Sequence, residues 1–401
     1  MPRDGTFIGR SRRGLDLLNF FLADVQTGFG PFIAVYLTAH KWTQGRIGLA
    51  LSLGTVVALL AQVPAGVLVD AAHNKRWIVG IGLIGVMTAA LLLALWPAEL
   101  PVLVAQTLHA LASCVITPAI AAISLHLVGH ADLGERLGRN ARFGSIGNGM
   151  AAAVMGASGL YFSSRAVFWL TAGLCVPALV ALAMIGRGTY ARRQTTAPPF
   201  DFAGLMKLFR DRRLLIFAAC VMLFHLSNAA MLPLAGAAVT MRAGSLANLI
   251  IGACIVVPQA VVALASPWVG RHAADYGRRP MLLLGWFALP VRGILLAVLP
   301  GPYLLVAGQA FSGISAAVFG VMLPLIAADL TRGTSHFNLC LGVLGLAVAS
   351  GAALSTGYAG WVADLAGMPA AFVSLAIAGL AGTLLVWAAM PDTTPGPCAA
   401  K

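Results

Sequence analysis

The sequence predicts an all-α membrane protein, with twelve transmembrane helices in two pseudo-symmetric six-helix bundles. Three observations carry this prediction: an apolar composition, a one-sided distribution of basic residues, and a basic loop that occurs twice. Of the 401 residues, 59% are hydrophobic and 10% are charged, whereas soluble domains carry about 25% charged residues. A chain this apolar would expose too much hydrophobic surface to water, so we expect it to lie in lipid.

About twelve apolar segments are long enough to cross a bilayer, which takes roughly 20 residues of helix. In chain order they cover residues 15–38, 46–69, 77–96, 101–127, 142–162, 166–186, 213–240, 247–269, 281–299, 302–328, 338–362 and 369–390. The longest polar connection, 187–212, is rich in basic residues. We therefore expect an N-terminal bundle (1–186), a cytoplasmic linker (187–212) and a C-terminal bundle (213–401). Apolar residues at helical spacing in 200–213 predict a short helix on the membrane surface.

The basic residues fall mostly on one side of the predicted spans. With the N-terminus in the cytoplasm, most of the 26 Lys and Arg lie in the tails or in cytoplasmic connections, as the positive-inside rule requires. The exceptions on the outer side are Lys41, Arg46, Arg165 and Arg242. The net charge of +13 therefore indicates topology and not nucleic-acid binding. We expect a multi-pass protein of the bacterial inner membrane with both termini cytoplasmic.

A basic loop occurs twice, about half the chain apart. The first copy reads GVLVDAAHNKRW from Gly66, and the second reads GRHAADYGRRPM from Gly270. Further pairs keep nearly the same offset: Pro31 with Pro233, Gln106 with Gln309, and Phe143 with Phe337. Duplicated halves with apolar segments around a basic hairpin are how many secondary transporters are built.

The twelve spans, the central linker and the repeated loop together resemble the major facilitator superfamily, over nearly the whole chain. In that family the loop between the second and third spans reads Gly-x-Leu-Ala-Asp-Arg-x-Gly-Arg-Lys. The first copy matches this pattern at Gly66, Leu68, Asp70, Lys75 and Arg76. The second copy matches its basic end at Gly277, Arg278 and Arg279, while Ala274 takes the position of the acid and Asp275 follows it.

The resemblance implies that the repeated loop works as a conformational latch. In the family, the loop acid caps a helix end and pairs with basic groups to hold the outward-facing state; carboxylates favour helix N-termini on physical grounds as well. The latch residues implied are Gly66, Asp70, Lys75, Arg76, Asp275, Gly277, Arg278 and Arg279. The alternative is that these charges only set the topology.

Within the family, the chain looks most like bacterial exporters of drugs or metabolites. That subgroup has a glycine-rich antiporter signature in the fifth span. The fifth span here has the glycines, which favour close helix packing, but not the signature's proline. The fourth span offers Gln106 and His109 where the subgroup carries a buried Arg.

Polar groups inside hydrocarbon are costly, so each one needs a reason. Asp24 is the one acid deep in a predicted span and Arg292 the one deep base, whereas Asp16, Asp329 and Asp364 lie near span ends. Asp24 is followed by two glycines and a proline, which weaken the helix and free backbone groups to bind ligand or water. Asp24 and Arg292 are thus the sharpest functional candidates.

The repeat aligns Asp24 and Gln26 with a second polar pair, His225 and Asn228, at a similar depth. A carboxylate in this setting can take up a proton near neutral pH, and a histidine can do so with less perturbation. We therefore expect Asp24 and His225 to couple protons to substrate movement. The expected cavity residues are Gln26, Gln106, His109, Asn228, Met231, Gln309, Ser312 and Arg292. The alternative is that Asp24 pairs permanently and only fixes packing.

Arg292 follows Pro290 in a span expected to be peripheral. It either snorkels to the outer surface, pairs with a helix-end carbonyl, or turns inward at the proline to hold an anionic substrate. A further alternative concerns Met222, His225 and Met231, because thioether and imidazole groups suit Cu(I). Methionine in an apolar helix is usually a packing residue, so we expect no metal site.

These observations predict a secondary transporter that exports a small organic molecule, drug-like or a secondary metabolite, by proton-coupled alternating access. The alternatives are uptake of a small metabolite, transport of a metal ion or a metal-chelating metabolite, and a membrane sensor that does not transport. No phosphate-binding loop or catalytic constellation occurs in the sequence, so we expect neither an enzyme nor a cofactor. The expected partners of this monomer are a small-molecule substrate, protons and the lipid bilayer.

Overall fold

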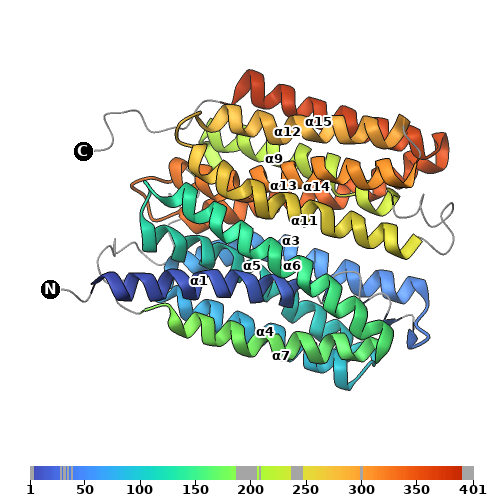
Figure 1. The fold of residues 1–401 in the computed structure, drawn as a ribbon, viewed down its shortest axis with the longest axis horizontal. Helices are drawn as coiled ribbons and strands as arrows, with labels where there is room; N and C mark the ends of the chain where they lie inside the picture. Colours follow the sequence, from blue (N-terminus) through green and yellow to red (C-terminus); the bar gives the residue numbers. More distant parts are fainter. Residues whose placement is uncertain are drawn as a thin grey trace. The chain divides into compact units, whose positions relative to one another are not determined.

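The computed structural model describes residues 4–27, 29, 33, 36–37, 39–186, 206, 209–235, 247–298 and 301–390. All regular structure in these residues is helical (Figure 1). The prediction of an all-α protein is therefore confirmed. Most of the predicted linker, 187–212, and most of its predicted surface helix lie outside the described residues.

The helices follow the predicted spans in order. Those of the first half are α1 (Asp4–Thr27), α3 (Gln44–Ala71), α4 (Lys75–Leu95), α5 (Glu99–Val128), α6 (Leu133–Tyr161) and α7 (Ser164–Met184). Those of the second half are α9 (Arg212–Asn228), α11 (Ala247–His272), α12 (Arg278–Val298), α13 (Pro302–Leu330), α14 (Phe337–Ala366) and α15 (Met368–Ala389).

Ten helices in the described part of the chain are long and apolar enough to cross a membrane. The two that do not qualify are α1 and α6. Several charged residues occupy the first half of α1, and glycine, serine and asparagine make the second half of α6 less apolar. Both helices are nonetheless as long as their neighbours, at 24 and 29 residues.

The chain divides into two compact units. The first comprises Met1–Leu133, Phe143–Asp201 and Thr334–Gly342. The second comprises Gly134–Arg142, Phe202–Gly333 and Val343–Lys401. The beginning of α6 thus groups with the second unit, and the beginning of α14 with the first.

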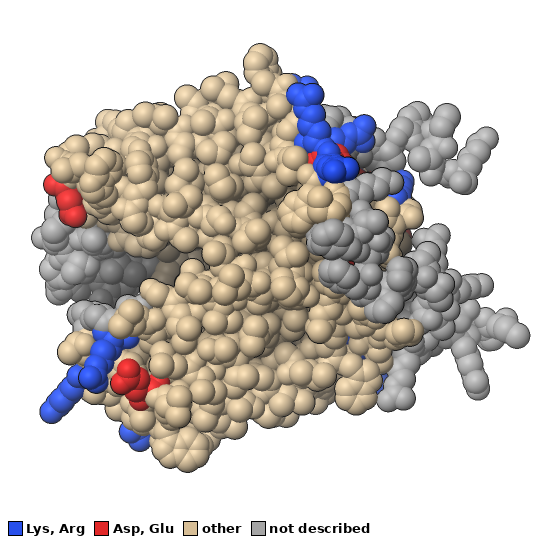
Figure 2. Space-filling model, turned by 180° about the vertical axis from the view of Figure 1, so that it is seen from behind, with Lys and Arg blue, Asp and Glu red and all other residues tan. Residues whose placement is uncertain are grey.

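The described surface is apolar where lipid is expected. Large side chains such as Leu60 and Leu264 are 71% and 79% exposed, which water would not tolerate on a soluble protein of this composition. On the face shown in Figure 2, the described charged side chains lie near the two ends of the helices, with other residues between them. This is the surface that a bilayer requires, because hydrocarbon does not solvate charge.

The first unit is organised around one face of α4. Val79, Leu83, Val86, Ala90 and Leu93 are fully buried, and they recur at the spacing of three and four residues that places side chains on one side of a helix. This face belongs to a core that also draws on α1, α5 and α7. The hydroxyl of Tyr36 donates to the carbonyl of Leu93, which satisfies the phenol inside the core.

The second unit is organised around an aromatic cluster. Trp286 of α12 is fully buried, and its indole nitrogen donates to the carbonyl of Cys220 in α9 at 3.1 Å. Phe224 lies with its ring centroid 4.6 Å from that of Trp286 and 4.9 Å from that of Phe319 in α13. The cluster holds α9, α12 and α13 together next to the polar residues described in the following section.

Helices α1 and α6 approach closely at Gly147. A Cβ added there would collide with the backbone carbonyl of Phe20, so only glycine permits this separation. The sequence predicted that glycines in this segment serve close packing, and Gly147 confirms it.

We expect Gly147→Ala to lower the free energy of unfolding by about 1–3 kcal/mol, because the added methyl group must displace backbone. Gly173→Ala is the matched control: Gly173 lies inside α7 with nothing within 4 Å of its Cβ position, so this change should be neutral or stabilise by up to about 1 kcal/mol. Thermal unfolding of the purified protein in detergent measures both. Equal stability of the two variants would contradict the close approach of α1 and α6.

Candidate functional site

The first copy of the repeated loop anchors the beginning of α14. Asp70, in the last turn of α3, accepts hydrogen bonds from the backbone N–H groups of Asn338 and Leu339, at 3.0 and 2.7 Å. The side-chain amide of Asn338 donates to it as well, at 2.6 Å. The first N–H groups of a helix have no partners within the helix and carry partial positive charge, so a carboxylate there is favourable. Asp70 is the cap of α14.

Glycine brings the two helices close enough for this cap. A Cβ on Gly66 would collide with the carbonyl of Asn338, and a Cβ on Gly342 would lie 2.5 Å from the carbonyl of Gln62. The backbones of α3 and α14 are therefore in direct contact at two places. Gly66, one turn before Asp70, contacts Asn338, and Gly342, one turn after Asn338, contacts Gln62. All of these residues belong to the first unit.

The basic residues of the first copy close the loop itself. The ammonium group of Lys75 donates to the carbonyl of Ala72 at 2.9 Å. Asn74 caps α4 by accepting from the N–H of Arg76 at 3.2 Å, and the guanidinium of Arg76 lies 3.5 Å from the carbonyl of Ala183 in α7. Lys75 and Arg76 thus tie the start of α4 to the end of α3 and to α7.

The second copy repeats the helix crossing with a different acid. A Cβ added to Gly270 of α11 would collide with the backbone carbonyl of Gly134 in α6. Likewise, a Cβ added to Gly138 of α6 would collide with the carbonyl of Ser266 in α11. The same offset that separates Gly66 from Gly270 relates each of these positions to one at the α3–α14 crossing. The corresponding pairs are Gln62 with Ser266, Gly66 with Gly270, Asn338 with Gly134, and Gly342 with Gly138. Ala274 stands where Asp70 would be and cannot cap a helix. Here α6 carries its own acid, Glu135, in its first turn.

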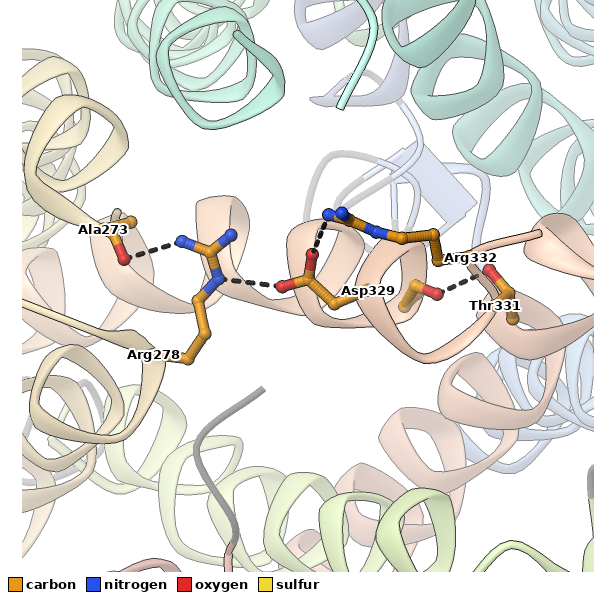
Figure 3. Close-up of polar contacts among 6 residues, drawn as sticks. Ala273, Arg278, Asp329, Thr331 and Arg332 are labelled. Atoms are coloured by element: carbon orange, nitrogen blue, oxygen red, sulfur yellow. Dashed lines mark hydrogen bonds and ion pairs between the residues drawn. The ribbon is translucent and has the colours of Figure 1, made fainter. Parts of the chain in front are cut away.

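The basic end of the second copy pairs with a buried acid of α13, Asp329. The guanidinium of Arg278 donates to Asp329 at 2.9 Å and to the carbonyl of Ala273 at 2.6 Å, as Figure 3 shows. Arg332 approaches the other carboxylate oxygen of Asp329 at 3.4 Å. The side chains of Arg278 and Asp329 are 6% and 4% exposed. Asp275, the acid that the sequence assigned to the latch, is exposed.

Sequence reasoning missed Asp329 and Asn338 as functional candidates. Asp329 was visible as an acid near a span end, but its partner Arg278 lies on another helix. Asn338 follows Phe337, the residue that matches Phe143 in the repeat. That match places the counterpart of this helix start ten residues inside α6, whereas the glycine contacts pair Asn338 with Gly134 in the first turn of α6. The sequence match was therefore misleading here.

Deep in the second unit, three polar side chains form what we call the Arg292 cluster: Asn228, Arg292 and Gln309. The two terminal nitrogens of Arg292 donate to the amide oxygens of Asn228 and Gln309, each at 2.8 Å. Arg292 and Gln309 are each 1% exposed, and Asn228 is half-buried. The three residues come from α12, the end of α9 and the first turns of α13.

The packing of α12 explains why Arg292 points inward. It lies on the same face as Leu289 and Leu296, which are buried. The next residue, Gly293, has no side chain, so the methyl end of Met231 and the backbone of Phe372 reach within 3.1 Å of its Cβ position. Arg292 therefore does not reach the outer surface, which removes the snorkelling interpretation.

The remaining predicted cavity residues are not joined into this cluster. In the first unit, Gln106 is 6% exposed, and His109 stacks on Phe29 with ring centroids 4.0 Å apart. In the second unit, Met231 is fully buried in an apolar core and Ser312 is half-buried one turn after Gln309. Asp24 and Gln26 lie on α1, but their side chains are outside the described part of the structure.

His225 lies on α9 one turn before Asn228, between aromatic rings. Its ring centroid is 5.2 Å from that of Phe224 and 4.7 Å from that of Phe319. Its Nδ1 lies 3.2 Å from the carbonyl of Val221, so Nδ1 carries a hydrogen and donates it. Its Nε2 is then the nitrogen that can accept a proton.

Asp329 offers a direct test of the second-copy network. We expect Asp329→Asn to lower the free energy of unfolding by about 3–5 kcal/mol, because it removes the carboxylate that pairs with the buried Arg278. Arg332→Gln should cost at most about 1 kcal/mol, because the Arg332 side chain is exposed to solvent. The matched control is Asp275→Asn, which should be neutral. Thermal unfolding in detergent measures all three, and equal effects of the two acid variants would contradict the role of Asp329.

Comparison with known proteins agrees with this architecture. The sequence model of the Major Facilitator Superfamily matches residues 15–257 and 235–399. Two relatives from Mycobacterium tuberculosis are each 39% identical over 395 residues, covering 96% of this chain and 94% of the relative. They are the "Uncharacterized MFS-type transporter" Rv2456c of strain H37Rv and MT2531 of strain CDC 1551.

Solved structures share the fold at low sequence identity. The human organic anion transporter MFSD10 (TETRAN) is 16% identical with a TM-score of 0.70, covering 96% of this chain and 100% of its own. A point mutant of the nucleoside transporter NupG is 17% identical with a TM-score of 0.66, covering 95% of this chain and 99% of its own. On the strength of the family match and the 39% identical relatives, this chain belongs to the Major Facilitator Superfamily and is a multi-pass membrane transporter.

Proposed function

We propose that the chain is a secondary active transporter that exports a small organic molecule by proton-coupled alternating access. The observation that carries this proposal is a repeat-related pair of buried amides. Gln106 of α5 and Gln309 of α13 are 6% and 1% exposed, inside helices that are predominantly apolar. A transporter of this architecture holds its substrate near the middle of the membrane, between the two repeats.

Asp24 and His225 are the proposed proton carriers. The repeat aligns the Asp24 segment of α1 with the His225 segment of α9. His225 presents one nitrogen as an acceptor, and its surroundings are aromatic. Protonation of either group changes the charge of the region through which substrate moves, and this is how a proton gradient can drive transport.

The proposed orientation places both termini in the cytoplasm of a bacterial cell, with the protein in the inner membrane. The basic loops between α3 and α4 and between α11 and α12 then face the cytoplasm, as the positive-inside rule favours. Arg165 and His40, whose side-chain nitrogens lie 3.3 Å apart, would face the outside. A monomer is sufficient for this mechanism.

Asp70 is the proposed conformational latch. Its three hydrogen bonds hold the beginning of α14, which groups with the first unit, while the rest of that helix belongs to the second. Loss of these bonds would free the helix end, so the carboxylate favours the state in which the bonds are made.

We expect Asp70→Asn to accelerate hydrogen exchange at the backbone amides of Asn338 and Leu339 by at least about tenfold, because bonds to a charged acceptor contribute about 1.5–3 kcal/mol. Asp275→Asn, at the displaced acid of the second copy, is the control and should leave both amides unchanged. Exchange is read by mass spectrometry on the protein in detergent. Unchanged protection in Asp70→Asn would contradict the latch.

Asp24→Asn tests the proton coupling. In inverted vesicles with an imposed pH gradient, we expect the wild-type protein to accumulate at least one of a set of fluorescent organic compounds that includes ethidium and carboxyfluorescein. The variant should lose the part of the accumulation that depends on the gradient, because an amide does not titrate. Asp364→Asn, which alters an exposed acid of α14, should behave as wild type. Gradient-driven accumulation that survives in Asp24→Asn would end the coupling hypothesis.

A further inference from the structure

Arg292 is a permanent positive charge with neutral partners. Its side chain is 1% exposed, and its described hydrogen bonds go to the amides of Asn228 and Gln309. Moving an ion out of water costs several kcal/mol, and neutral amides offset only part of this. Among the described residues, the ion pairs of the second unit involve Asp329 and not Arg292. The charge of Arg292 therefore lacks a described counter-ion.

Some hydrogen-bond donors of the Arg292 cluster have no acceptor among the described residues. Arginine has donors and no acceptor, so both amides must turn their oxygens toward it. Their NH₂ groups are then the remaining polar groups. The Nε of Arg292 and the Nε2 of Gln309 are buried and have no partner in the described part of the chain. The open groups are thus all N–H donors around one positive charge.

Such a cluster is complementary to a group with acceptors and negative charge. A carboxylate meets both requirements, since it offers two acceptor oxygens and no donor, and it forms the strongest hydrogen bonds with guanidinium. A cation is repelled by the cluster, and a neutral amide leaves the charge uncompensated.

The position of the cluster suits a transported ligand. At 1.5 Å per residue, Arg292 lies about 21 Å along α12 from Arg278 and about 9 Å before the end of the helix at Val298. It therefore falls within the roughly 30 Å that the hydrocarbon core spans. Asn228 is the half-buried member, so it is the one of the three side chains that a ligand would contact first. Its neighbour one turn away, His225, is a proposed proton carrier.

We propose that the transported molecule is an organic carboxylate, and that its carboxylate binds the Arg292 cluster. The proposal rests on the proposed function in one respect, because it names the substrate class of that transporter. In the loaded protein the ligand supplies the counter-charge that the cluster itself does not contain.

Binding in detergent, without any gradient, tests the site. The probes are benzoate, 2-naphthoate and indole-3-acetate, each with its primary amide and the corresponding amine, and the readouts are thermal stabilisation and calorimetric titration. We expect stabilisation by carboxylates and not by their amides or amines. Arg292→Gln should weaken carboxylate binding about 10- to 100-fold, as loss of a charged hydrogen-bond donor predicts, and Arg292→Lys should be intermediate because it keeps the charge but not the fork.

Two further variants keep the test independent of folding. Arg271→Gln removes an exposed arginine on α11 and should bind as wild type. Asn228→Asp puts a carboxylate inside the cluster, so it should raise the thermal stability of the empty protein and abolish carboxylate binding.

The outcomes separate this inference from the proposed function. Carboxylate binding that depends on Arg292, without flux driven by a pH gradient, would keep the anion site and contradict proton coupling. Gradient-driven flux that is unchanged in Arg292→Gln would keep the coupling and overturn the anion site. No Arg292-dependent response to any carboxylate, or an equal response to the amides, would also overturn it.

Discussion

Hydrocarbon cannot donate or accept a hydrogen bond, and every polar feature of this protein follows from that constraint. Backbone groups are satisfied by forming helices, so the described regular structure is helical throughout. Charges inside the molecule must find partners within it. Asp329 is held between two arginines, Asp70 by the end of a helix, and Arg292 by two amides. The first two charges are compensated within the described residues, and the third is not.

The two halves meet one structural requirement with different chemistry. In both, a helix that ends in a basic loop crosses the beginning of another helix through glycine, at Gly66 and at Gly270. In the first half the loop acid caps the crossing helix directly. At the second copy of the loop the crossing helix, α6, carries its own acid, Glu135, and the loop arginine, Arg278, pairs with Asp329 instead. Asp70 caps a helix whose remaining length belongs to the other unit, whereas the Arg278–Asp329 pair joins α12 and α13, which both lie entirely in the second unit. The first copy of the loop is therefore the better candidate for a switch, and the second copy forms a fixed link between two helices.

The sequence predicted the helices well because hydrophobic length and charge placement are local properties. It also predicted that Asp70 acts on a helix end, from a family pattern. It could not name Asn338 as the partner or promote Asp329 above other acids near span ends, since both roles depend on residues far away in the chain. The sequence left three interpretations of Arg292. Its burial and its two hydrogen bonds to amide oxygens exclude the interpretation that it snorkels to the outer surface. The roles of Asp24 and Gln26 stay predictions, because their side chains lie outside the described part of the structure.

The glycine crossings have a consequence for how the halves could diverge after duplication. The backbones of α3 and α14 are in direct contact at Gly66 and Gly342, and those of α6 and α11 at Gly134 and Gly270. Contacts of this kind specify the path of the helices without reference to neighbouring side chains. Residues around them are then free to change character while the scaffold keeps its shape. A duplicated gene could lose the acid at position 274, recruit another from α13 and still encode the same crossing.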